Sequence, residues 1–390
     1  MSGPSPLIFV VSGETSGDNL AGRLMAALKR KTDGKVRFAG VGGPASEAQG
    51  LTSLFPMRDL SLVGLAEVLP HLPRLIRRLN QTTDAVRALM PDAVVTVDSA
   101  GFSTRLAHHL RGSGIPVVHY VAPQLWAWRP GRARKLAKRV DHLMALLPFE
   151  EAFFAGYGIP CTYVGHPAIE GGAGHGDGLG FRTRHGIPPD APLLCVVPGS
   201  RASEVHRMLP VFGEALHRLK DRHPDLQVVI PVVDATAETV REDTRDWSLN
   251  VTLVDTGERY DAFAAADAAL AKSGTVTLEL ALAKVPMVVA YRVSAATAFL
   301  IRRMGVSVEH ASLANLLVGR EVVPEFIQEA CTGPALAEAV GGLLDSEEAR
   351  EMQRAGFREL TEVLGEPDPP PSERAAQVVL DIVNGRDKST

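Results

Sequence analysis

The stretch Lys272–Arg292, KSGTVTLELALAKVPMVVAYR, decides how this chain folds and where its first candidate site lies. Its small residues Ser273, Gly274 and Thr275 follow an apolar run and open a predicted helix, after which Met287–Tyr291 reads as a second strand. The first turn of such a helix has backbone N–H groups without intrahelical partners and carries the positive end of the helix dipole. This turn therefore suits a phosphate or a pyrophosphate.

Glu279 lies one helical turn beyond Thr275, on the same face of the predicted helix. There its carboxylate can accept hydrogen bonds from two ribose hydroxyls. A second interpretation stays open, in which Ser273 only caps the helix and Glu279 is a solvated side chain.

The same order of strand, helix and strand repeats along the chain on both sides of this stretch. Apolar β-rich runs alternate with helical segments, which predicts mostly parallel sheets covered by helices on both faces. The expected strands are Leu7–Val11, Val36–Val41, Ala93–Val97, Val117–Val121, His142–Leu146 and Cys161–Val164 in the first half, and Leu193–Val197, Gln227–Val233, Val251–Val254, Ala268–Ala271 and Met287–Tyr291 in the second.

We therefore expect an α/β protein with two doubly wound, Rossmann-like domains facing across a cleft. This arrangement is typical of a GT-B glycosyltransferase or a sugar-nucleotide epimerase. The predicted domains are residues 1–168 and 191–345. Residues 169–190, which include the glycine-rich run Gly171–Gly180, read as a linker or an inserted loop. Residues 346–390 read as a helical tail that packs back on a domain or is exchanged between subunits.

Composition excludes several classes of protein. The 390 residues are 45% hydrophobic and 22% charged, as in a globular chain, and the net charge of −4 gives no overall attraction to nucleic acid. No apolar run reaches the roughly 18–20 residues of a membrane helix, and no signal peptide is evident, so we expect a cytoplasmic protein. The three cysteines, Cys161, Cys195 and Cys331, lack metal-ligand spacing and read as buried thiols. We expect no metal and no cofactor.

Two motifs of the first half follow predicted strands. GETSGD, Gly13–Asp18, lacks the dinucleotide fingerprint, and its acidic groups would repel pyrophosphate, so Glu14, Ser16 and Asp18 suit the hydroxyls of an acceptor or a sugar. Asp98 ends the strand Ala93–Val97, where a carboxylate can deprotonate a hydroxyl nucleophile. The alternative is that Asp98 caps the helix that follows.

Two further motifs complete the candidate site. PQLWAWRPGR, Pro123–Arg132, concentrates Gln124 and two tryptophans, which suit a substrate wall better than core packing alone. PGSRASE, Pro198–Glu204, brings backbone donors at Ser200 and the Arg201 guanidinium toward a diphosphate and its departing charge. Because no acidic D-x-D clamp accompanies them, cationic side chains and a helix dipole are the expected leaving-group stabilisers.

These motifs together resemble the lipid-A-disaccharide synthase family. The residues that carry the resemblance follow one another from Gly13 to Glu325: GETSGD, LSLVGLAEVLPHLPRL at Leu60–Leu75, the strand end at Asp98, YVAPQLWAWRPGR at Tyr120–Arg132, LLPFE at Leu146–Glu150, YVGHP at Tyr163–Pro167, PGSRASE, SGTVTLELALAKVPMVVAYR and NLLVGREVVPE at Asn315–Glu325. The resemblance implies a GT-B fold and an inverting transfer. A UDP-linked 2,3-diacylglucosamine would pass to the 6′-hydroxyl of 2,3-diacylglucosamine 1-phosphate, giving the β-1′,6 lipid A disaccharide and UDP.

The resemblance also implies roles for single residues. Asp98 matches the general base. The positions expected around the UDP-sugar are Ser200, Arg201, Ser273, Gly274, Thr275, Glu279 and Asn315, and those on the acceptor side are Glu14, Ser16, Asp18 and Gln124. A homodimer with exchanged carboxyl-terminal segments is implied as well. The chain departs from the family pattern at Gly171–Gly180, which looks inserted, and at Ala314, where a proline is expected before Asn315.

The segment 60–78 is a candidate for docking on an anionic membrane surface. It has more apolar side chains than one helix face needs, Pro70 and Pro73 are expected to interrupt a regular helix, and a basic cluster follows. Because the substrates of the resembling family carry four acyl chains, this segment would hold the chain peripherally on the inner face of the cytoplasmic membrane. The alternative is that it packs the core. The candidate docking residues are Leu69, Leu72, Arg74, Leu75, Arg77 and Arg78.

Other functions remain open at the level of the sequence. They are another GT-B UDP-GlcNAc transferase, a non-hydrolysing UDP-GlcNAc 2-epimerase and a non-catalytic lipid-binding scaffold. A Rossmann-type dehydrogenase is disfavoured because the glycine fingerprint is missing.

Overall fold

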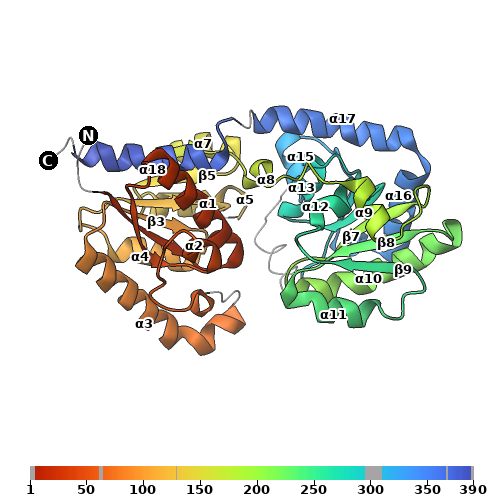
Figure 1. Ribbon diagram of the computed structural model, residues 1–390, viewed down its shortest axis with the longest axis horizontal. Coiled ribbons are helices and arrows are strands. Elements are labelled where there is room, and N and C mark those ends of the chain that lie inside the picture. The colour runs from red at the N-terminus through yellow and green to blue at the C-terminus, as the bar shows by residue number, and fades with distance from the viewer. Residues whose placement is uncertain (1–4, 61–64, 129, 295–309, 366–367, 388–390) are drawn as a thin grey trace. The chain divides into compact units, whose positions relative to one another are not determined.

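The computed structural model of the chain describes residues 5–60, 65–128, 130–294, 310–365 and 368–387, without the side chains of 65–70, 128 and 386–387 (Figure 1). These residues form two compact units. Unit 1 combines Met1–Pro167 with Glu366–Thr390, and unit 2 is Ala168–Gly365. The expected α/β class with two Rossmann-like domains is confirmed.

Unit 1 is built on a six-stranded parallel sheet in the order β2-β1-β3-β4-β5-β6. Its strands are β1 (Leu7–Ser12), β2 (Arg37–Val41), β3 (Ala93–Val97), β4 (Val117–Tyr120), β5 (His142–Ala145) and β6 (Cys161–Tyr163). Its helices are α1 (Thr15–Lys31), α2 (Pro44–Glu47), α3 (Leu65–Leu89), α4 (Ala100–His109), α5 (Leu125–Trp128), α6 (Ala133–Leu136), α7 (Pro148–Ala155) and α18 (Pro371–Asp387), with short 3-10 turns at Met57–Asp59 and Pro130–Arg132; α8 (Pro167–Glu170) leads into unit 2.

Alternate residues of the unit 1 strands enter two separate cores, because successive strand side chains point to opposite faces of a sheet. Phe9 and Val11 pack with side chains of α3, α4, α6 and α7. Ile8 and Val10 pack with α1 and α18 on the other face. Both faces are therefore covered, which explains why these strands read as continuous apolar runs.

Unit 2 repeats this design with the sheet order β12-β11-β10-β7-β8-β9, all parallel. Its strands are β7 (Leu193–Val197), β8 (Gln227–Pro231), β9 (Asn250–Val254), β10 (Ala268–Lys272), β11 (Met287–Tyr291) and β12 (Glu325–Ile327). Its helices are α9 (Gly178–Arg184), α10 (Ala202–Arg222), α11 (Asp234–Thr244), α12 (Arg259–Ala265), α13 (Thr275–Leu282), α15 (Leu313–Val318), α16 (Gly333–Asp345) and α17 (Glu347–Leu364), with a 3-10 turn at Gln328–Ala330. Strand β12 was not predicted.

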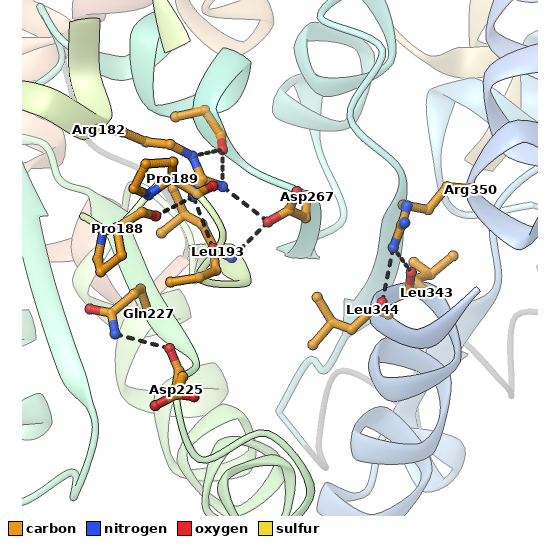
Figure 2. A network of polar contacts seen from close by, with 12 residues as sticks. Arg182, Pro188, Pro189, Leu193, Asp225, Gln227, Asp267, Leu343, Leu344 and Arg350 are labelled. Atoms are coloured by element: carbon orange, nitrogen blue, oxygen red, sulfur yellow. Dashed lines mark hydrogen bonds and ion pairs between the residues drawn. The ribbon is translucent and has the colours of Figure 1, made fainter. Parts of the chain in front are cut away.

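Residues 169–190 are an ordered part of unit 2, whereas the sequence suggested a linker or loop. Arg182 of α9 makes many of the contacts that hold this segment (Figure 2). Its guanidinium donates to the Ala265 carbonyl at 2.9 and 3.1 Å and pairs with Asp267 at 3.0 Å. It also donates to three carbonyls of the segment that leads into β7, those of Pro188, Pro189 and Ala191. Arg182 thus connects α9 and residues 188–191 to the end of α12 and to Asp267, which precedes β10.

The predicted tail 346–390 is divided between the two units. Helix α17 packs on α13, α15 and α16 of unit 2, and its Gln353 side chain bonds to both the N–H and the carbonyl of Met287. Helix α18 runs beside α1 of unit 1, where Arg30 pairs with Glu373 at 2.8 Å (Figure 1). Its buried face, which contains Ala375, Ala376, Val379 and Val383, completes one of the two cores of unit 1.

Helix α3 also differs from its prediction. Its backbone is helical from Leu65 to Leu89, through both Pro70 and Pro73, so the prolines do not interrupt it. Arg78 helps to hold the helix, because its guanidinium donates to Asp59 at 2.7 and 2.9 Å and lies 4.6 Å from the ring centre of Phe55. None of the helices among the described residues is long and apolar enough to span a membrane.

Candidate functional site

The candidate nucleotide site lies at the carboxyl ends of three adjacent strands of unit 2, β7, β10 and β11. The loop Pro198–Arg201 follows β7 and leads into α10, and Ser273–Gly274 follows β10 and leads into α13. Since neighbouring parallel strands end at the same edge of a sheet, the two predicted phosphate loops are side by side. Such an edge is where open α/β sheets bind their ligands.

The first loop depends on Gly199. Its φ of +126° is a conformation that L side chains rarely adopt, and an added Cβ would lie 2.6 Å from Oε2 of Glu204. The next residue, Ser200, donates its backbone N–H to the same oxygen at 3.2 Å. Arg201 Nη1 lies 3.6 Å from Glu204 Oε1, while the Arg201 side chain remains 53% exposed. The guanidinium is therefore anchored at the site and still accessible to a ligand.

The second loop is shaped by Ser273. Its hydroxyl donates to the Ala311 carbonyl at 2.6 Å, and Gly274 occupies the N-cap position of α13 without a side-chain cap. Ser273 thus joins two segments of unit 2 and does not act as the helix cap. The N–H of Thr277 already donates to the Gly274 carbonyl at 3.1 Å, so the N–H groups of Thr275 and Val276 are the ones at the start of α13 that suit an anion.

Glu279 of α13 is held by two neighbours from α12. Tyr260 donates its hydroxyl to Glu279 Oε1 at 3.1 Å, and Arg259 Nη2 lies 3.3 Å from the same oxygen. The Glu279 side chain is only 13% exposed, so it is not simply solvated. Both contacts are made at Oε1, which leaves Oε2 as the oxygen that can face a sugar hydroxyl.

Asn315 differs from its expected role. Its amide nitrogen donates to the Val323 carbonyl and to Glu325 Oε1, both at 2.8 Å. Its amide oxygen accepts from the N–H groups of Val322 and Val323 at 2.7 and 2.9 Å. These two donated and two accepted bonds use the full hydrogen-bonding capacity of the side chain. In this structure Asn315 therefore holds its own loop in place. A nucleotide contact would require it to exchange partners. The preceding Ala314 is fully buried within α15.

In unit 1, Asp98 lies at the end of β3 in a strained backbone segment. Asp98 and Ser99 have φ of +52° and +47°, and Val121, which follows the neighbouring strand β4, has φ of +76°. Left-handed φ values are uncommon for non-glycine residues, and for a β-branched residue such as valine they are genuine outliers that cluster at functional sites. Ser99 holds the N-cap position of α4, and Ser103 donates to the Asp98 carbonyl at 2.7 Å. Asp98 is therefore not the cap of this helix.

The GETSGD motif meets the Asp98 segment through Gly13. A Cβ on Gly13 would lie 2.3 Å from the Ser99 hydroxyl, so the two loops touch at this point. Glu14 is half-buried at the N-cap of α1 and Ser16 is exposed. Both are thus placed at the same edge of the unit 1 sheet as Asp98.

Asp18 of the same motif has a different environment. It is 2% exposed and accepts hydrogen bonds from the N–H groups of Gly43, Ala45 and Ser46 at 2.8–3.3 Å and from the Ser46 hydroxyl at 2.5 Å. Its carboxylate is used to hold the start of α2. The acceptor contact expected for Asp18 has no support in this arrangement.

The tryptophan-rich motif is fastened by a residue that sequence reasoning gave no role, Glu150. Trp126 donates its indole N–H to Glu150 Oε1 at 3.0 Å, while Oε2 accepts from the N–H groups of Leu146 and Leu147. Burial raises the pKa of Glu150, and these three hydrogen bonds oppose the shift. The sequence signal that could have identified Glu150 is its place as the third residue of α7, where a glutamate commonly accepts the backbone N–H at the helix start. Gln124 is exposed beside Trp126, and Arg129 lies outside the described residues.

The docking candidates of α3 separate into two groups. Leu75 packs against the core of unit 1, and Arg78 is held by Asp59, so both belong to the fold. Leu72 and Ile76 are 41% and 51% exposed, and Arg74 and Arg77 are exposed next to them, with Arg74 Nη1 3.7 Å from Asp59 Oδ1. The Leu69 side chain is outside the described part of the chain. The described ranges contain no group of three His, Cys, Asp or Glu side chains that could hold a metal ion.

Comparisons with known proteins identify the family of the chain. A family model described as lipid-A-disaccharide synthetase matches residues 8–379. The chain belongs to this family. It is 54% identical over 383 residues to the lipid-A-disaccharide synthase of Rhodospirillum centenum, which covers 97% of this chain and 95% of that protein. The corresponding enzyme of Paramagnetospirillum magneticum is 49% identical over 380 residues, 97% of each chain.

Solved structures match the fold at low sequence identity. An S. aureus MnaA-UDP co-structure superposes with a TM-score of 0.65 and 13% identity, over 99% of this chain and 98% of that one. CalG4, the calicheamicin glycosyltransferase, superposes with a TM-score of 0.57 and 18% sequence identity. The match covers 97% of this chain and 98% of that one. These matches confirm the GT-B architecture with Rossmann-like domains. Family membership makes the chain a glycosyltransferase that forms the lipid A disaccharide, and it disfavours the epimerase, dehydrogenase and scaffold alternatives.

Proposed function

We propose that this lipid-A-disaccharide synthase transfers 2,3-diacylglucosamine from its UDP donor to the 6′-hydroxyl of 2,3-diacylglucosamine 1-phosphate. The products are the β-1′,6 disaccharide 1-phosphate and UDP. The observation that carries this proposal is the 54% identity over 97% of the chain to a lipid-A-disaccharide synthase.

Asp98 is the general base in this proposal. Its carboxylate takes the proton of the 6′-hydroxyl as the hydroxyl oxygen forms a bond to the anomeric carbon of the donor. The bond from that carbon to the diphosphate oxygen breaks, and the electron pair leaves with UDP. Support comes from the strained segment at Asp98–Ser99 and Val121, since backbone strain of this kind is kept where the surrounding structure requires one particular geometry.

Unit 2 holds the UDP part of the donor. Ser200 and Arg201 from one loop and Ser273, Gly274 and Thr275 from the other surround the diphosphate, whose charge increases as the bond to the sugar breaks. Fixed N–H donors and a guanidinium aimed at that charge stabilise the transition state without a metal. Glu279 binds the ribose hydroxyls through the oxygen that Tyr260 and Arg259 leave available.

The acceptor is placed by Glu14, Ser16 and Gln124, which lie at the carboxyl edge of the unit 1 sheet. Because both substrates carry acyl chains, the protein works on the inner face of the cytoplasmic membrane. The exposed pair Leu72 and Ile76, with Arg74 and Arg77 beside it, supplies an apolar contact next to positive charge. This combination is typical of peripheral binding to anionic lipid.

A homodimer with exchanged carboxyl-terminal segments is also part of the proposal. The sequence between Leu364 and Pro371 is short, and α18 supplies an apolar face to the core of unit 1. The α18 of a second copy would bury the same face, which is the basis of domain swapping. Light scattering across a range of protein concentrations should give the dimer mass, and a monomer at every concentration would contradict the exchange.

The experiment that tests the activity is UDP release on mixing the purified chain with acylated acceptor and either the diacylated donor or unacylated UDP-glucosamine. UDP release and disaccharide formation are expected only with the acylated donor. Both should be unchanged when EDTA is added. Equal turnover of UDP-GlcNAc would point to another GT-B transferase or an epimerase, and a strict need for Mg²⁺ would contradict the role given to cationic side chains.

A further inference from the structure

Lys272, the last residue of β10, has a defined position inside the nucleotide site. Its ammonium lies 2.9 Å from Glu204 Oε1 and 5.2 Å from the ring centre of Tyr291. The side chains of Lys272 and Glu204 are each 15% exposed, which makes this ion pair unlike the solvated pairs on the helix surfaces. Lys272 is therefore held in place and directed toward the loop that follows β7.

The position of β10 in the sheet gives Lys272 both candidate phosphate loops as neighbours. Strand β10 pairs with β7 on one side and β11 on the other. The loop after β7 contains Ser200 and Arg201, and the loop after β10 begins at Ser273, the residue next to Lys272 in sequence. A cation at this point lies among the groups assigned to the diphosphate.

Glu204 connects these donors. Its Oε2 accepts the Ser200 N–H at 3.2 Å, and its Oε1 faces both Lys272 and, at 3.6 Å, Arg201. Burial raises the pKa of Glu204, but the hydrogen bond and charge of Lys272, the charge of Arg201 and the Ser200 N–H together lower it below the usual range. The carboxylate is consequently ionised at neutral pH and orients two cations and one N–H.

We propose that Lys272 is a further diphosphate-binding residue of this site and that Glu204 is the positioning residue that holds it there. The proposal rests on the UDP site described above and adds to it. An ammonium has three N–H donors, and Glu204 engages one, so two remain for diphosphate oxygens. With Arg201 it gives the departing UDP two side-chain cations, which take the part that a metal ion has in other glycosyl transfers.

Calorimetric titration of the full chain with UDP and with uridine tests this proposal. Lys272→Met should weaken UDP binding by about 10- to 100-fold, the range for one charge-assisted hydrogen bond, and leave uridine binding unchanged. Lys272→Arg should retain most of the UDP affinity. Lys284→Met, an exposed lysine of the same stretch, is the matched control and should bind UDP as the wild type does.

A second variant protects the test against misfolding. Lys272→Met leaves the Glu204 carboxylate without its main cation, whereas the double variant Lys272→Met/Glu204→Gln removes both charges and should show a selective loss of UDP affinity at least as large, because Glu204 also orients Arg201. UDP binding within about 2-fold of wild type in the folded double variant would overturn the proposal. So would an equal loss of UDP and uridine affinity, because that is the effect of a purely structural ion pair. If the wild type itself binds UDP no more tightly than uridine, the diphosphate site of the proposed function is wrong.

Discussion

Asp98 and Val121 follow two paired strands at the same level, and both have a left-handed backbone. Strand β3 pairs with β4 so that Val97 lies opposite Tyr120, and the next residue of each strand has φ of +52° and +76°. The Asp98 N–H donates to the Tyr120 carbonyl at 2.9 Å, which ties the two strand ends together. The candidate base is thus held by main-chain contacts and by a strained conformation that its neighbours impose.

The strain predicts an effect on stability at Ser99. Its φ of +47° costs roughly 1–2 kcal/mol for an L residue, a cost that glycine does not have. Ser99→Gly should therefore increase the free energy of unfolding of unit 1 by about 1 kcal/mol, after the larger chain entropy of glycine is subtracted. The matched control is Ser99→Ala, which removes the hydroxyl and keeps the strain. If urea unfolding gives equal stability for the two variants, the strain is not real.

A buried histidine in β4 predicts loss of stability in acid. Burial lowers the pKa of His119 to about 4, with Thr96 Oγ1 2.8 Å from its Nδ1 and no hydrogen-bond partner for Nε2 among the described residues. The folded pKa is below the unfolded value near 6.5, so the unfolded chain binds the proton more readily. The stabilisation is present above about pH 6.5 and is lost as pH falls toward 4.

Urea unfolding at pH 7 and pH 5 measures this effect. The wild type should lose about 2 kcal/mol more than His119→Asn between these pH values, because only the wild type must keep a neutral imidazole. The same pH dependence in both proteins would show that His119 is protonated in the folded state.

The contacts at Glu279 predict how the ribose is recognised. Glu279→Ala should weaken UDP binding by roughly 1–3 kcal/mol, the range for hydrogen bonds to a charged group. Tyr260→Phe removes only the hydroxyl that orients Oε1, so it should cause a smaller loss. Both losses should disappear with a 2′,3′-dideoxy analogue, which lacks the hydroxyls. Unchanged calorimetric affinity of Glu279→Ala for UDP would remove Glu279 from the site.

The exposed face of α3 predicts which side chains contact lipid. Replacing Leu72 and Ile76 with serine should lower binding to anionic vesicles by about 30-fold, because half-exposed leucine-sized side chains each contribute on the order of 1 kcal/mol when buried. Leu89, the last residue of α3, and Met90, which follows it, are 46% and 56% exposed and provide the control pair. Co-sedimentation that is equal for the two double variants would place membrane binding elsewhere.

The sequence predicted the sheets well because their strands are buried on both faces. Expected and observed bounds coincide at Ala93–Val97, Leu193–Val197 and Met287–Tyr291. It missed β12, since three half-buried residues carry no periodic signal. It gave no sign of helix α9 within residues 169–190, because the contacts that hold this helix, among them those of Arg182 and Arg184, join residues far apart in sequence.

Side-chain roles were harder to predict than elements. Asp18 and Asn315 have residue types and motif positions that suit a ligand, but their partners are mostly backbone groups, with the Ser46 hydroxyl and the Glu325 carboxylate, that only the folded chain brings close. Lys272 and Glu204 stand far apart in sequence and meet because β7 and β10 are neighbours in the sheet. The sequence therefore indicated the edge of the sheet at which the site lies. It did not indicate which polar residues of that edge bond to other parts of the protein.

The most direct test of the account is the Asp98→Asn variant, measured for disaccharide formation and for UDP affinity. Asparagine keeps the shape and tolerates the left-handed backbone, but it cannot accept the proton of the 6′-hydroxyl. Turnover should fall by about 10²–10⁴-fold, the usual contribution of a general base, while UDP binds within a few-fold of wild type because its groups belong to unit 2. Turnover that stays within 10-fold of wild type would remove Asp98 from the reaction and contradict the mechanism.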